Sequence, residues 1–385
     1  MNRSPSRLVA ALALSLAAPF AFADGAPTYT IIDLGALPGD VSQAFAISNN
    51  GSSIVGRSFM TVATPTLWNA AGTMTALPEL AGRANAVALG VNNSGVAVGT
   101  ASTTISGTAP LPVMWKNGVA TQLAMPGNYT VGRATAINNN GVAVGSVGSG
   151  TGQVAAVYGT GGSTLVPQLS DGSGWMISAQ GINDSGLVIG AGFDLNNQAR
   201  NSALLYNTNT GTVTDLGAVA GKNGALPFAI SNSGYVVGAS MQNQGAGLPF
   251  IWSAATGMMA IPLLNGTSYG SAAGVNSSGW VVGSDGAQYS NPWLYANGSL
   301  YSVASLLPAN SGWDFVMNTA SSATAISDNG NFVGTAYFNG VAHAYEMVLT
   351  TAVPEPGSYA LLLAGLGFVA GVARRRTAGK RARRA

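Results

Sequence analysis

A short glycine-containing motif recurs seven times along this chain. In each copy, a pair of small or apolar residues precedes two or three Asn, Ser or Asp residues and a glycine, and an apolar triplet and a second glycine follow. The first glycines of the copies are Gly51, Gly95, Gly141, Gly186, Gly234, Gly279 and Gly330. Their mean spacing of about 46 residues is typical of propeller blades. One repeated unit therefore accounts for most of the 385 residues, in place of two or three unrelated domains.

Each copy has the pattern of four short strands. Apolar, often β-branched residues around Asn-x-x-Gly predict a hairpin, since Asn can bond within its own turn and Gly adopts a positive φ. A third strand ends in an aromatic residue, as in Leu67-Trp68, and a fourth follows, as in residues 212–217. The first copy contains one additional residue, Ser53, which we interpret as a β-bulge.

The position of one strand distinguishes a ring from an open array. The seventh copy has no fourth strand, whereas residues 31–35, near the N-terminus, have nearly the same sequence as the fourth strand of the fourth copy. A ring can pair this strand with the last three and protect two sheet edges. The sequence therefore predicts an all-β, seven-bladed β-propeller of four-stranded blades over residues 24–350, closed by its N-terminal strand. The alternative is a β-helix or an array of β-sandwiches.

The repeats also resemble a known extracellular family. Residues 343–345 read His-Ala-Tyr, and the copies alternate as Ala-Ile-Asn-x-x-Gly-x-Val-Val-Gly. This pattern is similar to the HAF extracellular repeat, which is named for a His-Ala-Phe triplet. The hairpin matches well, but His343 occurs only in the seventh copy and Tyr345 replaces the Phe. The resemblance implies secretion and a repeat fold, and no particular chemistry.

The N-terminus has the layout of a secretory signal peptide. Arg3 and Arg7 precede an apolar run over residues 8–22, and Ala21-Phe22-Ala23 provides a cleavage site. We therefore expect residues 1–23 to be removed by signal peptidase.

The C-terminus carries a second targeting segment. Residues 351–356 contain Val353, Pro354, Glu355 and Pro356, and an apolar stretch over 357–373 precedes a basic tail over 374–385 that begins Arg374, Arg375, Arg376. As a helix, the stretch spans about 25 Å, which is near the lower limit for crossing a hydrocarbon core of roughly 30 Å, and the basic residues favour a cytoplasmic tail. The arrangement resembles the PEP-CTERM sorting signal of Gram-negative bacteria, which implies recognition and cleavage by an exosortase. The alternative is an ordinary tail anchor.

Charge and composition exclude several classes of function. Between residues 24 and 353 there are six basic and twelve acidic residues, which gives a net charge of −6. The basicity of the whole chain therefore belongs to the two targeting segments. An acidic body argues against nucleic-acid binding. The chain has no cysteine and one histidine, so we expect no disulfide, no metal site and no cofactor.

The residue types associated with catalysis are explained by the repeat itself. The single histidine, His343, lies at a repeat position, and Asp184 and Asp328 replace Asn in the turns of other copies. Asp33 and Asp215 lie on equivalent strands of different blades, where capping is a sufficient explanation. The sequence therefore predicts no catalytic residues and no enzyme activity.

The remaining prediction is binding by loops. In a four-stranded blade, the turns between the first and second and between the third and fourth strands share one face, whose loops are uniform in length here. We call it the uniform face, and the opposite one the variable face. The variable face carries Trp175, Trp313 and Phe193, which could stack on sugar rings or contact a protein.

We therefore expect a surface-displayed or extracellular structural or binding module. We expect the C-terminal helix to anchor it transiently in the membrane. Its expected partners are exopolysaccharide or envelope proteins. The alternative is a secreted propeller lyase or hydrolase, which would need carboxylates or His343 at the channel mouth.

Overall fold

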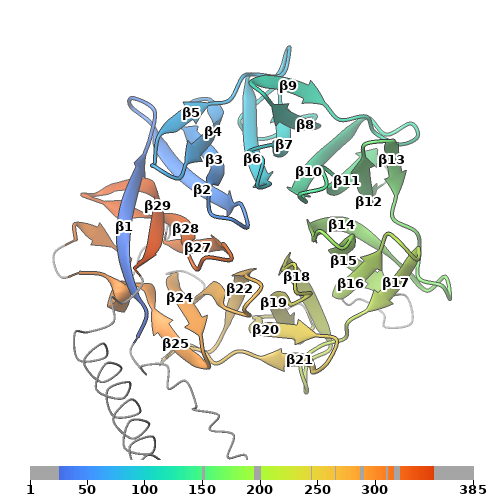
Figure 1. The fold of residues 1–385 in the computed structure, drawn as a ribbon. Helices are drawn as coiled ribbons and strands as arrows, with labels where there is room; N and C mark the ends of the chain where they lie inside the picture. Colours follow the sequence, from blue (N-terminus) through green and yellow to red (C-terminus); the bar gives the residue numbers. More distant parts are fainter. Residues whose placement is uncertain are drawn as a thin grey trace, which may run out of the picture.

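The computed structural model describes residues 26–149, 152–194, 201–243, 245–264, 266–286, 290–308, 311–315 and 321–350. These residues form seven antiparallel sheets arranged as a ring (Figure 1). Successive blades follow one another around the axis, and the first strand of each blade lies innermost. The predicted seven-bladed β-propeller is therefore confirmed, and the open-array alternative is wrong.

Six blades each consist of four consecutive strands. The first three are β2 (Val41–Ile47), β3 (Ser53–Phe59), β4 (Ala63–Asn69) and β5 (Met74–Ala76); β6 (Asn85–Val91), β7 (Ala97–Ser102), β8 (Leu111–Lys116) and β9 (Val119–Gln122); and β10 (Val131–Ile137), β11 (Ala143–Ser149), β12 (Gly152–Gly159) and β13 (Gly162–Leu165). The next three are β14 (Gly174–Ile182), β15 (Leu187–Asp194), β16 (Asn201–Asn207) and β17 (Thr212–Asp215); β18 (Gly224–Ile230), β19 (Val236–Met241), β20 (Leu248–Ser253) and β21 (Gly257–Ala260); and β22 (Gly270–Val275), β23 (Val281–Asp285), β24 (Asn291–Ala296) and β25 (Ser299–Ser302).

The seventh blade joins the two ends of the ring. It contains β27 (Ser322–Ile326), β28 (Phe332–Phe338), β29 (Val341–Thr350) and, as its outer strand, β1 (Thr28–Gly35). A two-residue strand, β26 (Trp313–Asp314), also pairs with β28, and the 3-10 helix η2 (Val303–Leu306) follows β25.

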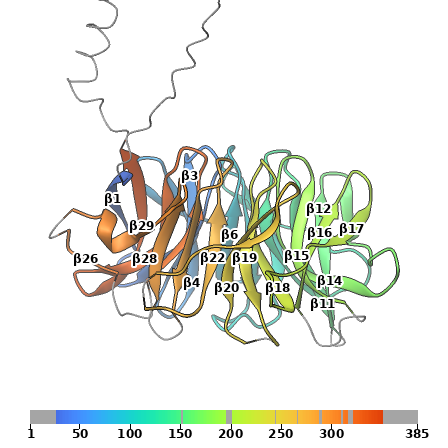
Figure 2. The same ribbon diagram turned by 90° about the horizontal axis from the view of Figure 1, so that it is seen from below.

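Side chains reinforce the pairing of β1 with β29. The two strands are antiparallel, with Thr28 opposite Thr350. The hydroxyls of Thr28 and Thr350 are 2.7 Å apart, and the Tyr29 hydroxyl donates to the Gly330 carbonyl at 3.1 Å. Gly330 belongs to the turn between β27 and β28, so the described chain enters and leaves the ring at the uniform face. Figure 2 shows β1 and β29 side by side at one end of the ring. The predicted closing strand is confirmed.

Every inner strand contains a β-bulge at the same position. At this position, the register between the first and second strands shifts by one residue in all seven blades and leaves one inner-strand residue without a partner. β14 contains a second shift, at Ile177. The residues without partners at the shared position are Phe45, Leu89, Thr135, Gln180, Phe228, Ala273 and Thr324. The bulge predicted at Ser53 is wrong, because Ser53 pairs regularly with Asn69 and the additional residue lies in the turn.

The bulge explains the second glycine of the motif. A Cβ added to Gly99 would overlap the carbonyl oxygen of Val87, and one added to Gly334 would overlap that of Ser322. The same overlap occurs at the second glycine of the other five blades. In each case, the carbonyl belongs to the inner strand, two residues before the bulge. A side chain at this position would therefore require the inner strand to move.

Hydrogen bonds between turns link all seven blades at the uniform face. In the simplest link, the backbone N–H of Asn93 donates to the Asn139 side chain of the next blade at 2.9 Å. The other links are Asn50 to Asn93, Asn139 to Asp184, Asp184 to Asn232, Ser233 to Ser277, Ser277 to Asp328, and Asp328 to Asn49. We call this closed set of bonds the turn ring. The Asn, Ser and Asp residues of the motif therefore hold neighbouring blades together as well as shaping their own turns.

The hydrophobic core lies between the blades. Seven clusters of buried side chains each span neighbouring blades. Trp68, Trp115 and Trp293 are fully or almost fully buried, and each indole N–H donates a hydrogen bond, to the Leu34 carbonyl, the Pro78 carbonyl and the Asp285 carboxylate respectively. The aromatic residues of the third strands therefore fill the space between sheets while their polar atoms remain satisfied.

Of the segments outside the ring, the predicted signal peptide and the predicted helix at residues 357–373 lie outside the described residues. Among the residues that are described, no helix has the length and apolar character needed to cross a membrane.

Deletion of residues 28–34 should strongly destabilise the ring. It removes the outer strand of the seventh blade and two buried side chains, Tyr29 and Leu34, each worth about 1.5–3 kcal/mol on burial. The control replaces residues 103–109, which are all exposed, with glycine and serine. We expect the melting temperature of the deletion variant to fall far below that of the control. Equal melting temperatures would contradict closure by β1.

Substitution of Glu346 by Gln should stabilise the protein at neutral pH. Glu346 is 1% exposed, and its Oε2 atom has no hydrogen-bond partner. Burial raises the pKa of this carboxyl above its usual value of 4.5, although Asn331 donates to Oε1 at 2.9 Å and opposes the shift. Because the folded state holds the proton more tightly than the unfolded state, ionised Glu346 destabilises the fold above the folded pKa. This cost disappears as the pH falls through that pKa.

The measurement is thermal unfolding from pH 4 to pH 8. Glu346→Gln should melt above wild type at pH 8 and near it at pH 4, whereas Glu79→Gln, at an exposed position, should follow wild type throughout. A constant difference across this range would contradict the assignment.

Candidate functional site

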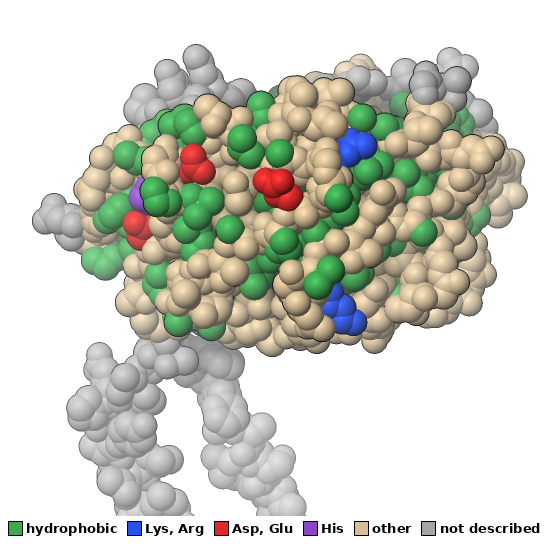
Figure 3. Space-filling view, turned by 90° about the horizontal axis from the view of Figure 1, so that it is seen from above, with side chains coloured by type: hydrophobic (Ala, Val, Ile, Leu, Met, Phe, Trp, Pro, Cys, Tyr) green, Lys and Arg blue, Asp and Glu red, His purple; other side chains and the backbone are tan. Residues whose placement is uncertain are grey.

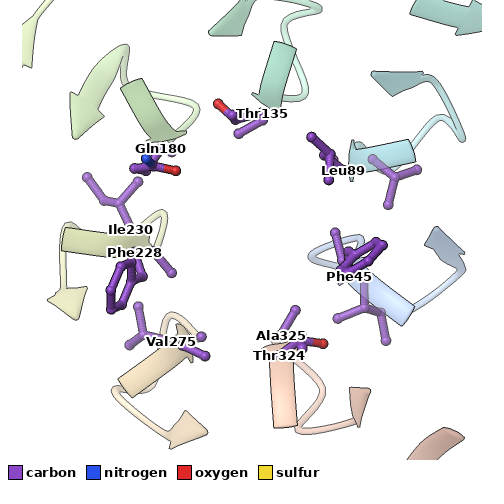
Figure 4. A pocket seen from close by; sticks show the side chains of 18 of the residues that line it. Phe45, Leu89, Thr135, Gln180, Phe228, Ile230, Val275, Thr324 and Ala325 are labelled. Carbon is purple, nitrogen blue, oxygen red and sulfur yellow. The ribbon is translucent and has the colours of Figure 1, made fainter. Parts of the chain in front are cut away.

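The bulged residues converge on the axis of the ring. Figure 4 shows Phe45, Leu89, Thr135, Gln180 and Phe228 projecting from separate blades toward a common space. The cavity there has a volume of about 180 Å³. Phe228 is 39% exposed although it lies inside the ring. The bulge therefore turns one side chain per blade out of the space between the sheets and into the central channel.

Most residues that line the channel are glycine or have apolar side chains. Two of its polar residues, Thr135 and Thr324, donate to the inner strand of the following blade, at the Ala179 carbonyl (2.7 Å) and the Ala44 carbonyl (3.0 Å). Asp328 is the one carboxylate among the described lining residues. Because its Oδ1 atom accepts from the Ser277 N–H at 2.8 Å, Asp328 is part of the turn ring. The channel cavity, at about 180 Å³, is smaller than typical ligand pockets, which measure roughly 300–1,000 Å³.

Asp184 has a similar structural role. Its Oδ1 atom accepts from the Asn139 N–H, and its Oδ2 atom accepts from the side-chain amides of Asn139 and Asn232 at 2.8 Å. One carboxylate therefore bridges three blades. Asp184 and Asp328 are therefore explained by hydrogen bonds to neighbouring turns. The repeat pattern alone does not reveal these bonds between blades.

The histidine lies far from the channel, on the outer part of the seventh blade. His343 on β29 places Nδ1 2.9 Å from the Asp33 Oδ1 atom on β1. Asp33 also accepts from the Gly35 N–H at 2.9 Å, and Asp215 accepts from the Gly217 N–H at 2.8 Å. Both acids therefore cap their own Asp-Leu-Gly turns, as expected. Among the residues described, no group of three or more His, Cys, Asp or Glu side chains could hold a metal ion.

The predicted aromatic residues occupy equivalent places in two blades. Trp175 pairs across strands with Phe193, with ring centroids 6.0 Å apart, and Phe193 is 38% exposed. Trp313 pairs with Phe338, with centroids 4.9 Å apart, and its ring also lies 5.9 Å from that of Tyr345. Neither tryptophan lines the channel. Both are half-buried against their own blades, and their contact with a ligand stays a prediction.

A second cavity opens at the variable-face mouth of the channel. It has a volume of about 740 Å³ and extends over the fifth, sixth, seventh and first blades. Its lining includes Tyr269, Ser271, Ser284, Ser290 and Ser322. These residues were not predicted from the sequence, because strand residues and connecting residues of the sixth blade meet Ser322 of the seventh blade only in the folded ring. The sequence feature that could have indicated two of them is the serine two positions before the bulge in the sixth and seventh blades, Ser271 and Ser322.

Few charged groups lie near these cavities. Arg57 donates two hydrogen bonds to the Gln43 side chain, at 2.8 and 3.0 Å, and its guanidinium lies 4.1 Å from the centre of the Phe59 ring. Burial lowers the pKa of Arg57. Figure 3 shows one side of the ring, where isolated charged side chains are separated by uncharged surface. The ring therefore has no broad charged surface on this side for a strongly ionic partner.

Known structures share the ring. Virginiamycin B lyase from Staphylococcus aureus has 12% identity and a TM-score of 0.52, over 84% of this chain and 100% of that chain. Oligogalacturonate lyase from Vibrio parahaemolyticus has 13% identity and a TM-score of 0.51, over 85% and 98%. YCF48 bound to a peptide has 10% identity and a TM-score of 0.52, over 85% and 98%. At these identities, the similarity shows the fold alone.

The sorting signal is the other finding. No curated protein matches the chain. Residues 352–376 match the PEP-CTERM protein-sorting motif, and this range includes Val353, Pro354, Glu355, Pro356 and the basic cluster Arg374, Arg375, Arg376. All of these residues lie outside those that the structure describes. The motif implies export, transient membrane anchoring in a Gram-negative bacterium and processing by an exosortase.

Proposed function

We propose that this protein is an exosortase-sorted binding module that acts at the cell surface or outside the cell, on exopolysaccharide or an envelope protein. The observation that carries the proposal is the PEP-CTERM match at residues 352–376, which begins two residues after the last strand of the ring. Export delivers a rigid ring whose variable face is opposite the strand end that leads into the sorting segment. The resemblance of the repeats to HAF repeats agrees with an extracellular location and stays a prediction.

The described side chains favour binding over catalysis. The one carboxylate of the channel lining, Asp328, is bonded within the turn ring, and His343 lies on the outer part of the seventh blade against Asp33. A lyase or hydrolase remains the alternative, because two of the similar structures are lyases, although they share only the fold. An enzyme of this kind would need an acid and a base close together at the channel mouth.

Replacement of Pro354 and Pro356 by Ala should prevent processing. If Pro-Glu-Pro is the recognition element, the double variant should remain longer and membrane-retained in a host that contains the exosortase. Pro262→Ala, at an exposed position of the ring, is the control. Intact-mass spectrometry of the exported protein measures the outcome. Detection of Arg384 on exported wild-type protein would remove the sorting proposal.

Trp175→Ala should weaken retention by the host's own exopolysaccharide in affinity electrophoresis. Loss of one aromatic stacking contact of about 1 kcal/mol corresponds to roughly fivefold weaker binding. Trp313→Ala tests the equivalent position, and melting curves must first show that both variants fold. If folded variants migrate like wild type, both tryptophans are packing residues. If wild type is not retarded, binding to this polysaccharide is excluded.

A further inference from the structure

The cavity at the variable-face mouth is larger than the cavity of the central channel. Its volume of about 740 Å³ falls within the range of small-ligand pockets, about 300–1,000 Å³. It meets the channel at Ala273 and Thr324, which line both cavities. The mouth cavity is therefore the entrance to the channel on the face opposite the C-terminal end of the ring.

Hydroxyl groups without partners line this cavity. Ser271 and Ser284 lie directly opposite each other on β22 and β23. Their side chains, together with those of Tyr269, Ser290 and Ser322, have no hydrogen-bond partner among the described residues, and all five are partly exposed. Hydroxyls both donate and accept hydrogen bonds, so five of them around one hollow offer a set of contacts that an adaptable polar ligand can use.

Small residues leave room for a ligand between these hydroxyls. Gly247, Gly270 and Gly286 line the cavity, and Ala239 and Ala246 form part of its wall. Tyr269 adds an aromatic ring, which suits contact with the apolar face of a sugar. Glycine and alanine in turn leave space for a ligand close to the backbone. Because the Gly270 and Gly286 N–H groups already donate to the Gly247 and Tyr269 carbonyls, the hydroxyls are the hydrogen-bonding groups that remain for a ligand.

The charge of the lining specifies the ligand further. Among the described residues that line the cavity, none is Asp, Glu, Lys, Arg or His. Arg57 lies outside the lining and is bonded to Gln43, which does line it. An anionic ligand would lose its hydration without gaining an ion pair. The chemistry of the cavity therefore favours an uncharged ligand with many hydroxyls.

We propose that the mouth cavity binds a neutral hexose unit of a polysaccharide, which is held by the hydroxyls of Ser271, Ser284, Ser290 and Ser322 and by Tyr269. This inference rests on the proposed binding function and assigns it a place and a ligand class. It is independent of Trp175 and Trp313, which do not line the cavity.

The test uses a double variant that copies another blade. The fifth blade has Leu226 and Ala239 where the sixth has Ser271 and Ser284, so Ser271→Leu with Ser284→Ala introduces residues that this fold already accommodates. The variant removes two hydroxyls and places an apolar side chain at the edge of the cavity. Ser299→Ala is the matched control, because Ser299 is exposed on the outer strand of the same blade. Melting curves verify that both variants fold.

Titration calorimetry with a panel of neutral hexose oligosaccharides, and with an alginate oligosaccharide as the anionic comparison, measures binding. We expect wild type and Ser299→Ala to bind a neutral member alike, and the double variant to bind it at least tenfold more weakly. A folded double variant with wild-type affinity would show that the sugar binds elsewhere, and the proposed function would stand.

Preference of wild type for alginate would overturn the neutral-ligand assignment alone. Failure of wild type to bind any oligosaccharide of the panel, together with no retardation by the host exopolysaccharide, would overturn the polysaccharide function and this inference together.

Discussion

The bulge in each inner strand is the local feature on which the arrangement of the ring depends. It turns one side chain per blade toward the axis, and it brings an inner-strand carbonyl against the second strand. Only glycine fits there, so the second glycine of every motif is a steric consequence of the bulge. The residue that follows the bulge is also small: a Cβ on Gly90 would lie 2.9 Å from the Ala136 Cα of the next blade. The small residues of the motif are therefore required because the strands approach one another closely around the axis.

The repeat made much of the fold predictable. The seven copies of the motif predicted the number of blades, and Asn-x-x-Gly located the turns. The displaced Asp-Leu-Gly strand predicted that the N-terminal strand closes the ring. The bulge was placed wrongly, at Ser53, because an inserted residue is visible in one sequence while a register shift common to all copies is not. The bulged residues themselves, among them Phe45, Thr135 and Ala273, share no side-chain type, since they face an open channel and no packing partner selects them.

The candidate site was less predictable, for a physical reason. The pocket at the mouth of the ring combines strand residues of several blades with residues of the connections between them, so no single motif contains its lining. Ser271 and Ser322 appear as ordinary polar strand residues until the ring brings their blades together. Aromatic residues were easier to identify in the sequence, but the structure shows that Trp313 contacts three aromatic rings of its own blade. Residue type alone does not separate a ligand contact from packing.

The pairing of Thr28 with Thr350 also affects the order of folding. These residues are separated by 322 positions, so the last sheet forms only when both ends of the ring are present and free to pair. Each doubling of a loop costs about 0.6 kcal/mol of chain entropy, so closing the ring costs about 2 kcal/mol more than closing one blade. Until then, β29 and the strand that will become β1 present unpaired edges, which are prone to aggregate. Because Thr350 lies only two residues before the sorting motif, an incompletely closed ring exposes these edges next to the segment that the motif occupies.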